Sequence, residues 1–361
     1  LSLHDALPIL LQDFVHKMEP TRQVMLAAQN NHQDKFSGVT DVIGYNYLEA
    51  RAISDHKKYP ERCFLISEEL PYYSGAEGNL RSYTPINPWS VIAAHDFIAG
   101  GFIWPGVDYL GEAGWPSKGW PNGLFDICMF EKPRAAYHRA MWNPEPMVRI
   151  AVKDPFADID HGRDLWQWPS IVDHWNFDGK FNGLVIEVLT TTNCEEVELY
   201  RNDKLMGRER AANYTNNTIV WNIPYTPGTL LAKGYNQGKE VAKWEIKTAG
   251  VPASLKAEAD RMEIAADGQD LSHISLTLVD KNGVKVQTDN RRISVKVSGE
   301  GRLKALDTGD LRVDSFCRDN VLTYFGQALL TVQSTRKAGN IRADIQVEGI
   351  DKPFSVMITT K

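Results

Sequence analysis

Cysteine, long apolar runs and a strong charge of one sign are all scarce in this sequence of 361 residues. Its four cysteines are widely scattered and form no Cys-x-x-Cys pair, which argues against a zinc site and a disulfide framework. No apolar stretch approaches the roughly 20 residues of a membrane-spanning helix. The net charge of −6 offers no basic surface for nucleic acid or anionic lipid. The sequence therefore predicts no nucleic-acid or membrane partner, and it requires no cofactor.

The beginning of the chain lacks an initiating methionine and the charged and apolar regions of a signal peptide. The opening "LSLHDALPI" leads at once into sequence that is typical of the middle of a domain. We therefore expect the chain to be a C-terminal piece of a larger protein. On that expectation, the missing signal peptide carries no information about where the parent protein resides.

Residues 1–142 alternate short apolar runs with helical patterns such as 90–100, which carries apolar residues at helical spacing. The predicted strands are apolar throughout, which favours a parallel sheet buried on both faces. Such βα units without a glycine-rich phosphate loop are more typical of half a (β/α)₈ TIM barrel than of a dinucleotide-binding fold. The four predicted strands lie in "RQVMLAA", "DVIGYNY", "CFLISEE" and "GGFIWPG".

The rest of the chain has a different pattern. Residues 146–250 and 251–361 alternate apolar and polar side chains over short runs, and turn pairs such as Gln237-Gly238 and Asn282-Gly283 separate them. Each region predicts a β-sandwich. The expected fold class is therefore multidomain, with an α/β region followed by two all-β domains.

Candidate site residues follow from the predicted barrel, because functional side chains lie at the carboxyl ends of barrel strands. Sugars pack their C–H faces on indole rings, and their hydroxyl groups need amide and carboxylate partners. A carboxylate beside the anomeric carbon can serve as the nucleophile of retaining glycoside hydrolysis. A strand-end glutamate can equally be a solvated or ion-paired group. The predicted strand ends and the following loop supply Asn46, Tyr47, Glu68, Trp104, Asp108 and Asn122.

These motifs resemble glycoside hydrolase family 2, in particular its bacterial β-galactosidases. The resemblance places the four predicted strands at positions five to eight of the family's barrel. It also places an immunoglobulin-like domain at the C-terminus, after a first β-sandwich. The motifs that carry it are "EPTRQV", "DVIGYNY", "FLISEE", "GGFIWPGVDYLGE", "WPNGLFD" and "KPRAAYH".

The resemblance also implies roles for the strand-end residues. Glu68 matches the family's nucleophile, and Tyr47 matches a tyrosine that donates a hydrogen bond to it, with Asn46 beside it. Successive side chains of a strand point to opposite sides, which supports choosing only one of Glu68 and Glu69 as the nucleophile, and the resemblance implies that it is Glu68.

Substrate contacts are implied for three further residues. Trp104 matches the aromatic platform of the sugar subsite, Asn122 matches an amide that contacts substrate hydroxyls, and Asp108 is a weaker match for the same role. The sequence indicates no metal ligands, and it leaves open any dependence on a divalent metal.

One element of the family is absent: no Asn-Glu pair at a strand end precedes "EPTRQV", so the general acid/base is missing. The resemblance implies a retaining exo-β-glycosidase, with a β-galactosidase acting on terminal β-galactosides as the first choice, and a chain that is inactive alone. A β-mannosidase, a β-glucuronidase using Lys118 as a cation, or a non-catalytic carbohydrate-binding protein remain open. We expect a carbohydrate partner and a periplasmic or secreted parent protein, while the oligomeric state is open.

Overall fold

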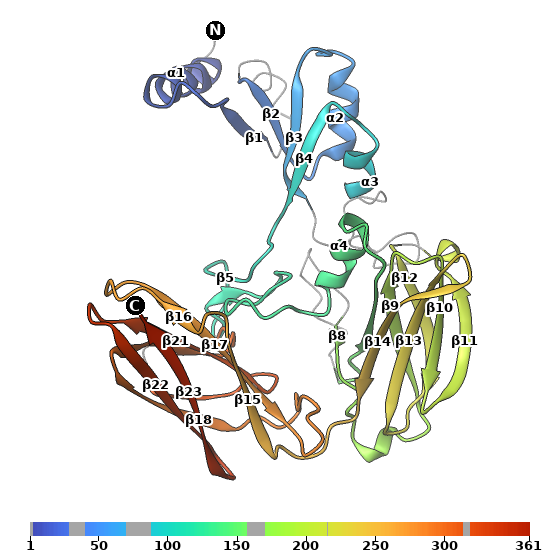
Figure 1. Cartoon of the computed structure of the whole chain (residues 1–361). Coiled ribbons are helices and arrows are strands. Elements are labelled where there is room, and N and C mark those ends of the chain that lie inside the picture. Colours follow the sequence, from blue (N-terminus) through green and yellow to red (C-terminus); the bar gives the residue numbers. More distant parts are fainter. Residues whose placement is uncertain (1–2, 29–39, 70–87, 157–169, 215, 313–317) are drawn as a thin grey trace. The chain divides into compact units, whose positions relative to one another are not determined.

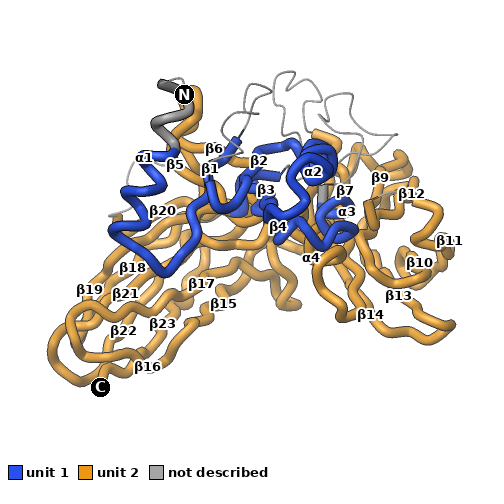
Figure 2. The backbone as a smooth tube through the Cα atoms, turned by 90° about the horizontal axis from the view of Figure 1, so that it is seen from above, with its two compact units in different colours: residues 1–106, 158–168 blue, residues 107–157, 169–361 orange. Residues whose placement is uncertain are grey.

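The computed structural model describes residues 3–28, 40–69, 88–156, 170–214, 216–312 and 318–361. The chain divides into two compact units, which Figure 2 colours separately. The described residues up to Gly106 form the first unit, and those from Val107 onward form the second. Among the described segments, no helix combines the length and the apolar character needed to cross a membrane.

The first unit is an α/β structure built on a four-stranded parallel sheet (Figure 1). The strands follow one another in space as they do along the chain, in the order β1-β2-β3-β4. All four predicted strands are present, and helices lie between β2 and β3 and between β3 and β4. The elements are α1 (Leu3–Met18), β1 (Met25–Ala28), β2 (Val42–Asn46), α2 (Glu49–His56), β3 (Cys63–Glu69), α3 (Pro88–Ala93) and β4 (Ile98–Ile103).

The helix predicted over residues 90–100 is much shorter in the structure. It ends at Ala93, and β4 already begins at Ile98. The imidazole Nδ1 of His95 lies 2.8 Å from the carbonyl oxygen of Val91, and the backbone N–H of Ile98 donates to the carbonyl of His95 at 3.0 Å. Ile98 then pairs with Phe64 of β3, so the apolar residues at the end of the predicted helix are used by the sheet instead.

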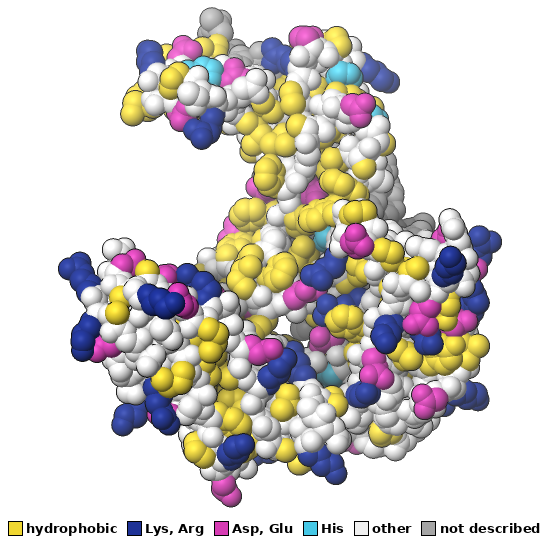
Figure 3. Space-filling view, in the orientation of Figure 1, with side chains coloured by type: hydrophobic (Ala, Val, Ile, Leu, Met, Phe, Trp, Pro, Cys, Tyr) yellow, Lys and Arg dark blue, Asp and Glu magenta, His cyan; other side chains and the backbone are white. Residues whose placement is uncertain are grey.

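One face of the sheet packs against the helices. Phe64 and Ile66 of β3 and Tyr45 of β2 are fully buried against residues of α2 and α3. The hydroxyl of Tyr45 donates to a carboxylate oxygen of Asp55 in α2 at 2.5 Å, which ties that helix to the strand. Large apolar side chains of β1 and β4, including Leu26 and Phe102, are exposed, and Figure 3 shows hydrophobic side chains gathered over this part of the chain.

The second unit begins with loops that contain a two-stranded sheet and one helix, and it continues as a β-sandwich. Two four-stranded sheets, β12-β9-β7-β8 and β11-β10-β13-β14, share a core in which Trp175 is fully buried and donates its indole N–H to the carbonyl of Thr226 at 2.8 Å. The elements are β5 (Tyr109–Leu110), β6 (Gly119–Trp120), α4 (Ala135–Trp142), β7 (Val148–Lys153), β8 (Ile171–Val172), β9 (Val185–Thr192), β10 (Glu196–Arg201), β11 (Lys204–Arg210), β12 (Thr218–Pro224), β13 (Thr229–Asn236) and β14 (Lys239–Lys247).

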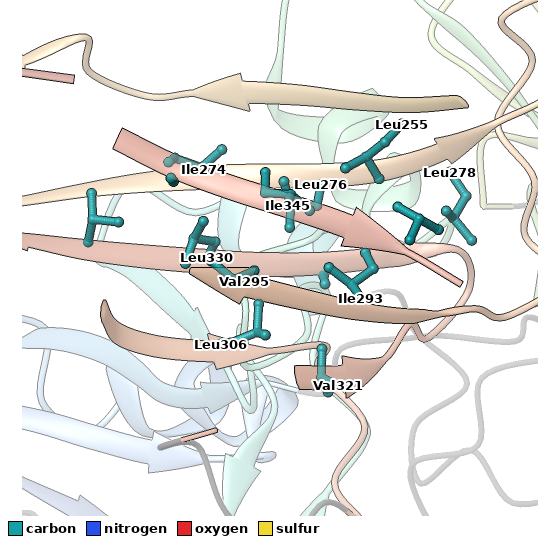
Figure 4. Packing of buried hydrophobic residues seen from close by; sticks show 14 of the residues in the cluster. Leu255, Ile274, Leu276, Leu278, Ile293, Val295, Leu306, Val321, Leu330 and Ile345 are labelled. Atoms are coloured by element: carbon teal, nitrogen blue, oxygen red, sulfur yellow. The ribbon is translucent and has the colours of Figure 1, made fainter. Parts of the chain in front are cut away.

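A second β-sandwich completes the chain, with sheets β15-β17-β21-β19 and β16-β23-β22-β18-β20. Its core is drawn in Figure 4, where Ile274, Leu276 and Leu278 of β17 lie among side chains of the facing sheet. These three are every second residue of the strand, because successive side chains point to opposite faces of a sheet and only alternate ones face the core. The strands are β15 (Ser254–Ala259), β16 (Glu263–Ile264), β17 (Leu271–Val279), β18 (Arg292–Gly299), β19 (Gly301–Asp307), β20 (Asn320–Leu322), β21 (Gln327–Ser334), β22 (Gly339–Val347) and β23 (Ile350–Thr360).

This packing predicts that two leucines of the same sandwich respond very differently to truncation. Leu276 is 0% exposed and Leu322 is 51% exposed. We expect Leu276→Ala to lower the free energy of unfolding by about 2–5 kcal/mol, because it leaves a cavity, and Leu322→Ala by less than about 0.5 kcal/mol. Urea denaturation of the chain measures both, and equal losses would contradict the core described here.

Candidate active site

Glu68 and Tyr47 meet at the carboxyl ends of two neighbouring parallel strands. The backbone N–H of Tyr47 donates to the carbonyl oxygen of Glu68 at 2.8 Å, and the Tyr47 hydroxyl donates to Oε2 of the same glutamate at 2.5 Å. Tyr47 has a φ of 61°, in the left-handed region that costs a non-glycine residue about 1–2 kcal/mol. The strained turn is therefore held by two bonds to one residue, and it sets the phenol against the carboxylate.

Asn46 is oriented by a serine that the sequence analysis did not single out. The hydroxyl of Ser67 donates to Oδ1 of the buried Asn46 at 2.7 Å. With its oxygen engaged, the amide presents its NH₂ group as a hydrogen-bond donor. A sequence signal did exist, because Ser67 directly precedes Glu68 on a strand that pairs with the one carrying Asn46.

The adjacent Glu69 lies in a very different environment from Glu68. Its side chain is only 1% exposed, and a Cβ placed on Gly101 would come within 3.0 Å of its Oε2 and 2.6 Å of Ile92 in α3. Neither carboxylate oxygen of Glu69 has a hydrogen-bond partner in the described part of the chain. Burial, with a smaller effect from nearby Glu49, raises the pKa of Glu69 to about 8. Glu69 therefore carries a proton at neutral pH and is a poor nucleophile.

Trp104 directly follows β4. Its backbone N–H donates to the carbonyl oxygen of Glu69 at 3.1 Å, which fixes the residue to the end of β3. The residue is 38% exposed, although an indole is a large apolar group. An exposed ring on a fixed backbone can serve as a stacking surface for a sugar.

Asp108 and Asn122 belong to the second compact unit. Both carboxylate oxygens of the buried Asp108 lie 2.6 Å from Nζ of Lys132, and Oδ1 also accepts the backbone N–H of Gly123 at 2.8 Å. Burial, followed by the charge of Arg134, lowers the pKa of Lys132 to about 8.

These bonds make Asp108 an anchor of its own loop. Gly123 has no room for a side chain, because a Cβ there would lie 2.3 Å from the backbone nitrogen of Asp108. The close approach holds the neighbouring Asn122, which is itself buried. A sugar contact by Asp108 remains a prediction, and its carboxylate would have to serve the sugar and Lys132 together.

Two family models match parts of the second unit. Residues 255–353 match the glycoside hydrolase family 2 C-terminal domain 5, and residues 183–242 match a domain of unknown function, DUF4982. The first match covers most of the second sandwich, and the second match lies within the first sandwich.

Relatives with known names match almost the whole chain. It is 26% identical to the β-galactosidase BoGH2A of Bacteroides ovatus, over 97% of this chain and 43% of that protein. It is 30% identical to a β-galactosidase of Thermoanaerobacter pseudethanolicus, over 97% of this chain and 46% of that protein. A glycosyl hydrolase family 2 member from Bacteroides cellulosilyticus superposes with a TM-score of 0.90 and 30% identity, over 100% of this chain and 48% of that one. The chain thus spans less than half the length of each.

The burial of Glu69 predicts a pH-dependent stability for the first unit. Its folded pKa of about 8 lies above the value of 4.5 that applies in the unfolded chain. The stabilisation from this group is therefore fully present below pH 4.5 and is lost as the pH rises toward about 8. Glu69→Gln removes this ionisation. The free energy of unfolding of the variant, relative to that of wild type, should therefore rise by roughly 2–5 kcal/mol as the pH increases across that window.

Hydrogen-exchange protection of the β3 amides, recorded across the pH window in wild type and variant, measures this difference. Glu61→Gln is the matched control, because the Glu61 side chain is 70% exposed and its charge stays in water. A constant difference between wild type and Glu69→Gln at all pH values would show that the Glu69 carboxyl ionises normally in the folded chain.

Proposed function

Because the chain belongs to glycoside hydrolase family 2, we propose that the whole protein is a retaining exo-β-glycosidase whose nucleophile is Glu68. The observation that carries this assignment is the pair of hydrogen bonds from Tyr47 to Glu68 at a strand end. The backbone bond fixes the main chain of Glu68, while the hydroxyl bond holds Oε2 and leaves Oε1 to attack an anomeric carbon. Glu69, buried and protonated, is not a rival for that role.

The proposed reaction has two steps. Glu68 attacks the anomeric carbon while a second carboxyl group protonates the leaving oxygen, so that a glycosyl-enzyme forms as the glycosidic bond breaks. The second group then takes a proton from a water molecule, whose oxygen attacks the anomeric carbon as the bond to Glu68 breaks, so that the sugar is released and the Glu68 carboxylate is restored. Retaining enzymes hold the two carboxyl groups about 5–5.5 Å apart. We expect the second group to come from outside these 361 residues, and we expect the chain to be inactive alone.

We further propose that β1 to β4 are the fifth to eighth strands of a (β/α)₈ barrel. Their parallel pairing in chain order and the helices between them support this. The exposed apolar side chains Leu26 and Phe102 are also expected of a sheet whose other face is covered in the whole protein. The second sandwich would be the immunoglobulin-like domain of the family.

For the substrate, we propose a terminal, non-reducing β-galactoside. Two relatives that match almost the whole chain bear the name β-galactosidase. Trp104 would supply the stacking platform, and Asn46, oriented by Ser67, would donate to a sugar hydroxyl. The alternative, a β-glucuronidase, would need a cation such as Lys118 beside the substrate carboxylate, because Lys132 is already bound to Asp108. We also propose that the parent protein is periplasmic or secreted.

The nucleophile assignment predicts the outcome of covalent trapping. A 2-fluoro β-galactoside should label the full-length protein at Glu68, because the fluorine slows hydrolysis of the glycosyl-enzyme. Glu68→Gln should abolish labelling and lower kcat by at least about 10³-fold, as the loss of a nucleophile does elsewhere. Mass spectrometry of peptides locates the label.

Glu69→Gln is the matched control for this experiment. It changes the adjacent acid, keeps the size of the side chain and should leave labelling at Glu68 intact. A label on another residue would refute the nucleophile assignment. Protein that binds galactose but is never labelled would favour a non-catalytic carbohydrate-binding protein.

A second prediction concerns Tyr47. A hydrogen bond to a charged group contributes about 1.5–3 kcal/mol, so Tyr47→Phe should lower kcat of the full-length protein by about 10- to 100-fold. Its effect on KM should be small, since the phenol contacts the carboxylate at 2.5 Å and is not a primary sugar contact in this proposal. Steady-state kinetics with aryl β-galactosides tests this, with Tyr59→Phe as a control. An unchanged kcat would remove Tyr47 from the mechanism.

A further inference from the structure

The second unit contains a cavity of about 360 Å³ whose wall includes Asp108 but none of the other candidate site residues. Its walls come from the loop that carries Asp126, from β8 and from three segments of the second sandwich. The volume falls in the lower part of the range of roughly 300–1,000 Å³ for small-molecule sites, so one or two sugar rings fit. Residues of the sandwich that line it include Lys285, Gln287, Tyr324, Phe325 and Gln327.

The turn at Phe325 is the unusual feature of this wall. The backbones of Tyr324 and Gln327 exchange two hydrogen bonds of 3.0 Å around Phe325 and Gly326, whose φ angles are 47° and 69°. Two-residue turns with both φ angles positive strongly prefer Asn-Gly. A phenylalanine in the left-handed region costs about 1–2 kcal/mol. Phe325 is 44% exposed, so a large part of its ring stays in contact with solvent although the backbone at this position is strained.

The ring of Phe325 is nevertheless held in place. Its centroid lies 4.5 Å from that of Tyr324, and the two ring planes meet at 63°. This edge-to-face contact supports Phe325 from one side, and the residue lines the cavity. A strained, exposed and supported aromatic ring beside polar groups is the arrangement that stacks on the C–H face of a sugar.

Three cationic side chains of the cavity wall already have partners within that wall. Lys132 binds Asp108 at 2.6 Å, Arg312 binds Asp310 at 2.8 Å, and Nζ of Lys285 donates to Oε1 of Gln327. An anionic ligand would have to compete with these partners for the three cations. A neutral ligand rich in hydroxyl groups can instead join the existing hydrogen bonds as donor and acceptor.

Side-chain amides and a carboxylate can meet those hydroxyl groups. Gln287 reaches across the cavity wall and donates to the carbonyl of Asp173 at 3.4 Å, a long bond that a better acceptor can replace. Oδ1 of Asp126 accepts the backbone N–H groups of Cys128 and Phe130 at 2.8 and 3.0 Å, which fixes the orientation of its carboxyl group.

From these features we propose that the cavity is a non-catalytic binding site for a neutral carbohydrate, with Phe325 as its stacking platform. This proposed binding site is separate from the proposed hydrolase activity and does not depend on Glu68. Gln287, Gln327 and Asp126 provide the hydroxyl partners. A site of this kind would hold a polysaccharide chain on the protein through the C-terminal sandwich.

Phe325→Asn tests the proposal sharply, because it should separate binding from folding. Asparagine followed by Gly326 suits the turn, so the variant should unfold at an equal or higher temperature than wild type. It should bind a neutral oligosaccharide at least about fivefold more weakly, because the stacking face is lost. Ligand-observed NMR titration of the 361-residue chain with galactobiose, cellotriose and xylotriose measures the affinity.

Two controls complete the experiment. Met262→Asn removes another exposed apolar side chain, 58% exposed, that does not line the cavity, and it should leave binding unchanged. Glu68→Gln should also leave binding unchanged, which separates this site from the proposed nucleophile. Binding that survives in Phe325→Asn, binding lost only in Glu68→Gln, or no binding of any of the three sugars by wild type would each overturn the proposal.

Discussion

The candidate active site depends on how Tyr47 is joined to Glu68. One bond fixes the backbone of the tyrosine to the end of β3, and the other sets its phenol 2.5 Å from the carboxylate. The parallel pairing of β2 and β3 makes both bonds possible, because it brings two strand ends to one edge of the sheet. The backbone strain at Tyr47 is tolerated because the sheet, the core beneath it and these two bonds all hold the same position.

Burial, and not residue type, separates the two adjacent glutamates. Glu68 and Glu69 have the same chemistry, but only Glu69 lies between the strand and α3, without a hydrogen-bond partner among the described residues. Its carboxyl group is therefore neutral near physiological pH, while Glu68 is held by a phenol. A single strand-end carboxylate can act as a nucleophile. Retaining hydrolysis also requires a second carboxyl group as acid and base.

The second unit uses its polar groups differently. Asp108 and Lys132 neutralise each other inside a loop that only a glycine at position 123 allows to close. The cavity beside this loop is lined by Phe325, whose ring is partly exposed and whose backbone conformation favours asparagine. Each sandwich has a large apolar core that stabilises it, so the fold tolerates the strain at one turn.

The sequence by itself determined where the strands of the first unit lie and the order in which the α/β region and the two β-sandwiches follow along the chain. Continuous apolar runs identified all four strands of the first unit, and alternation identified the two sandwiches, because side-chain periodicity is a local property. The resemblance to a known family added the pairing of Tyr47 with Glu68, and the structure contains that hydrogen bond. The sequence could not find the early end of α3, the bond from Ser67 to Asn46, the proton on Glu69 or the cavity at Phe325. Each of these depends on burial and on contacts between residues far apart in the chain, and only the tertiary structure decides them.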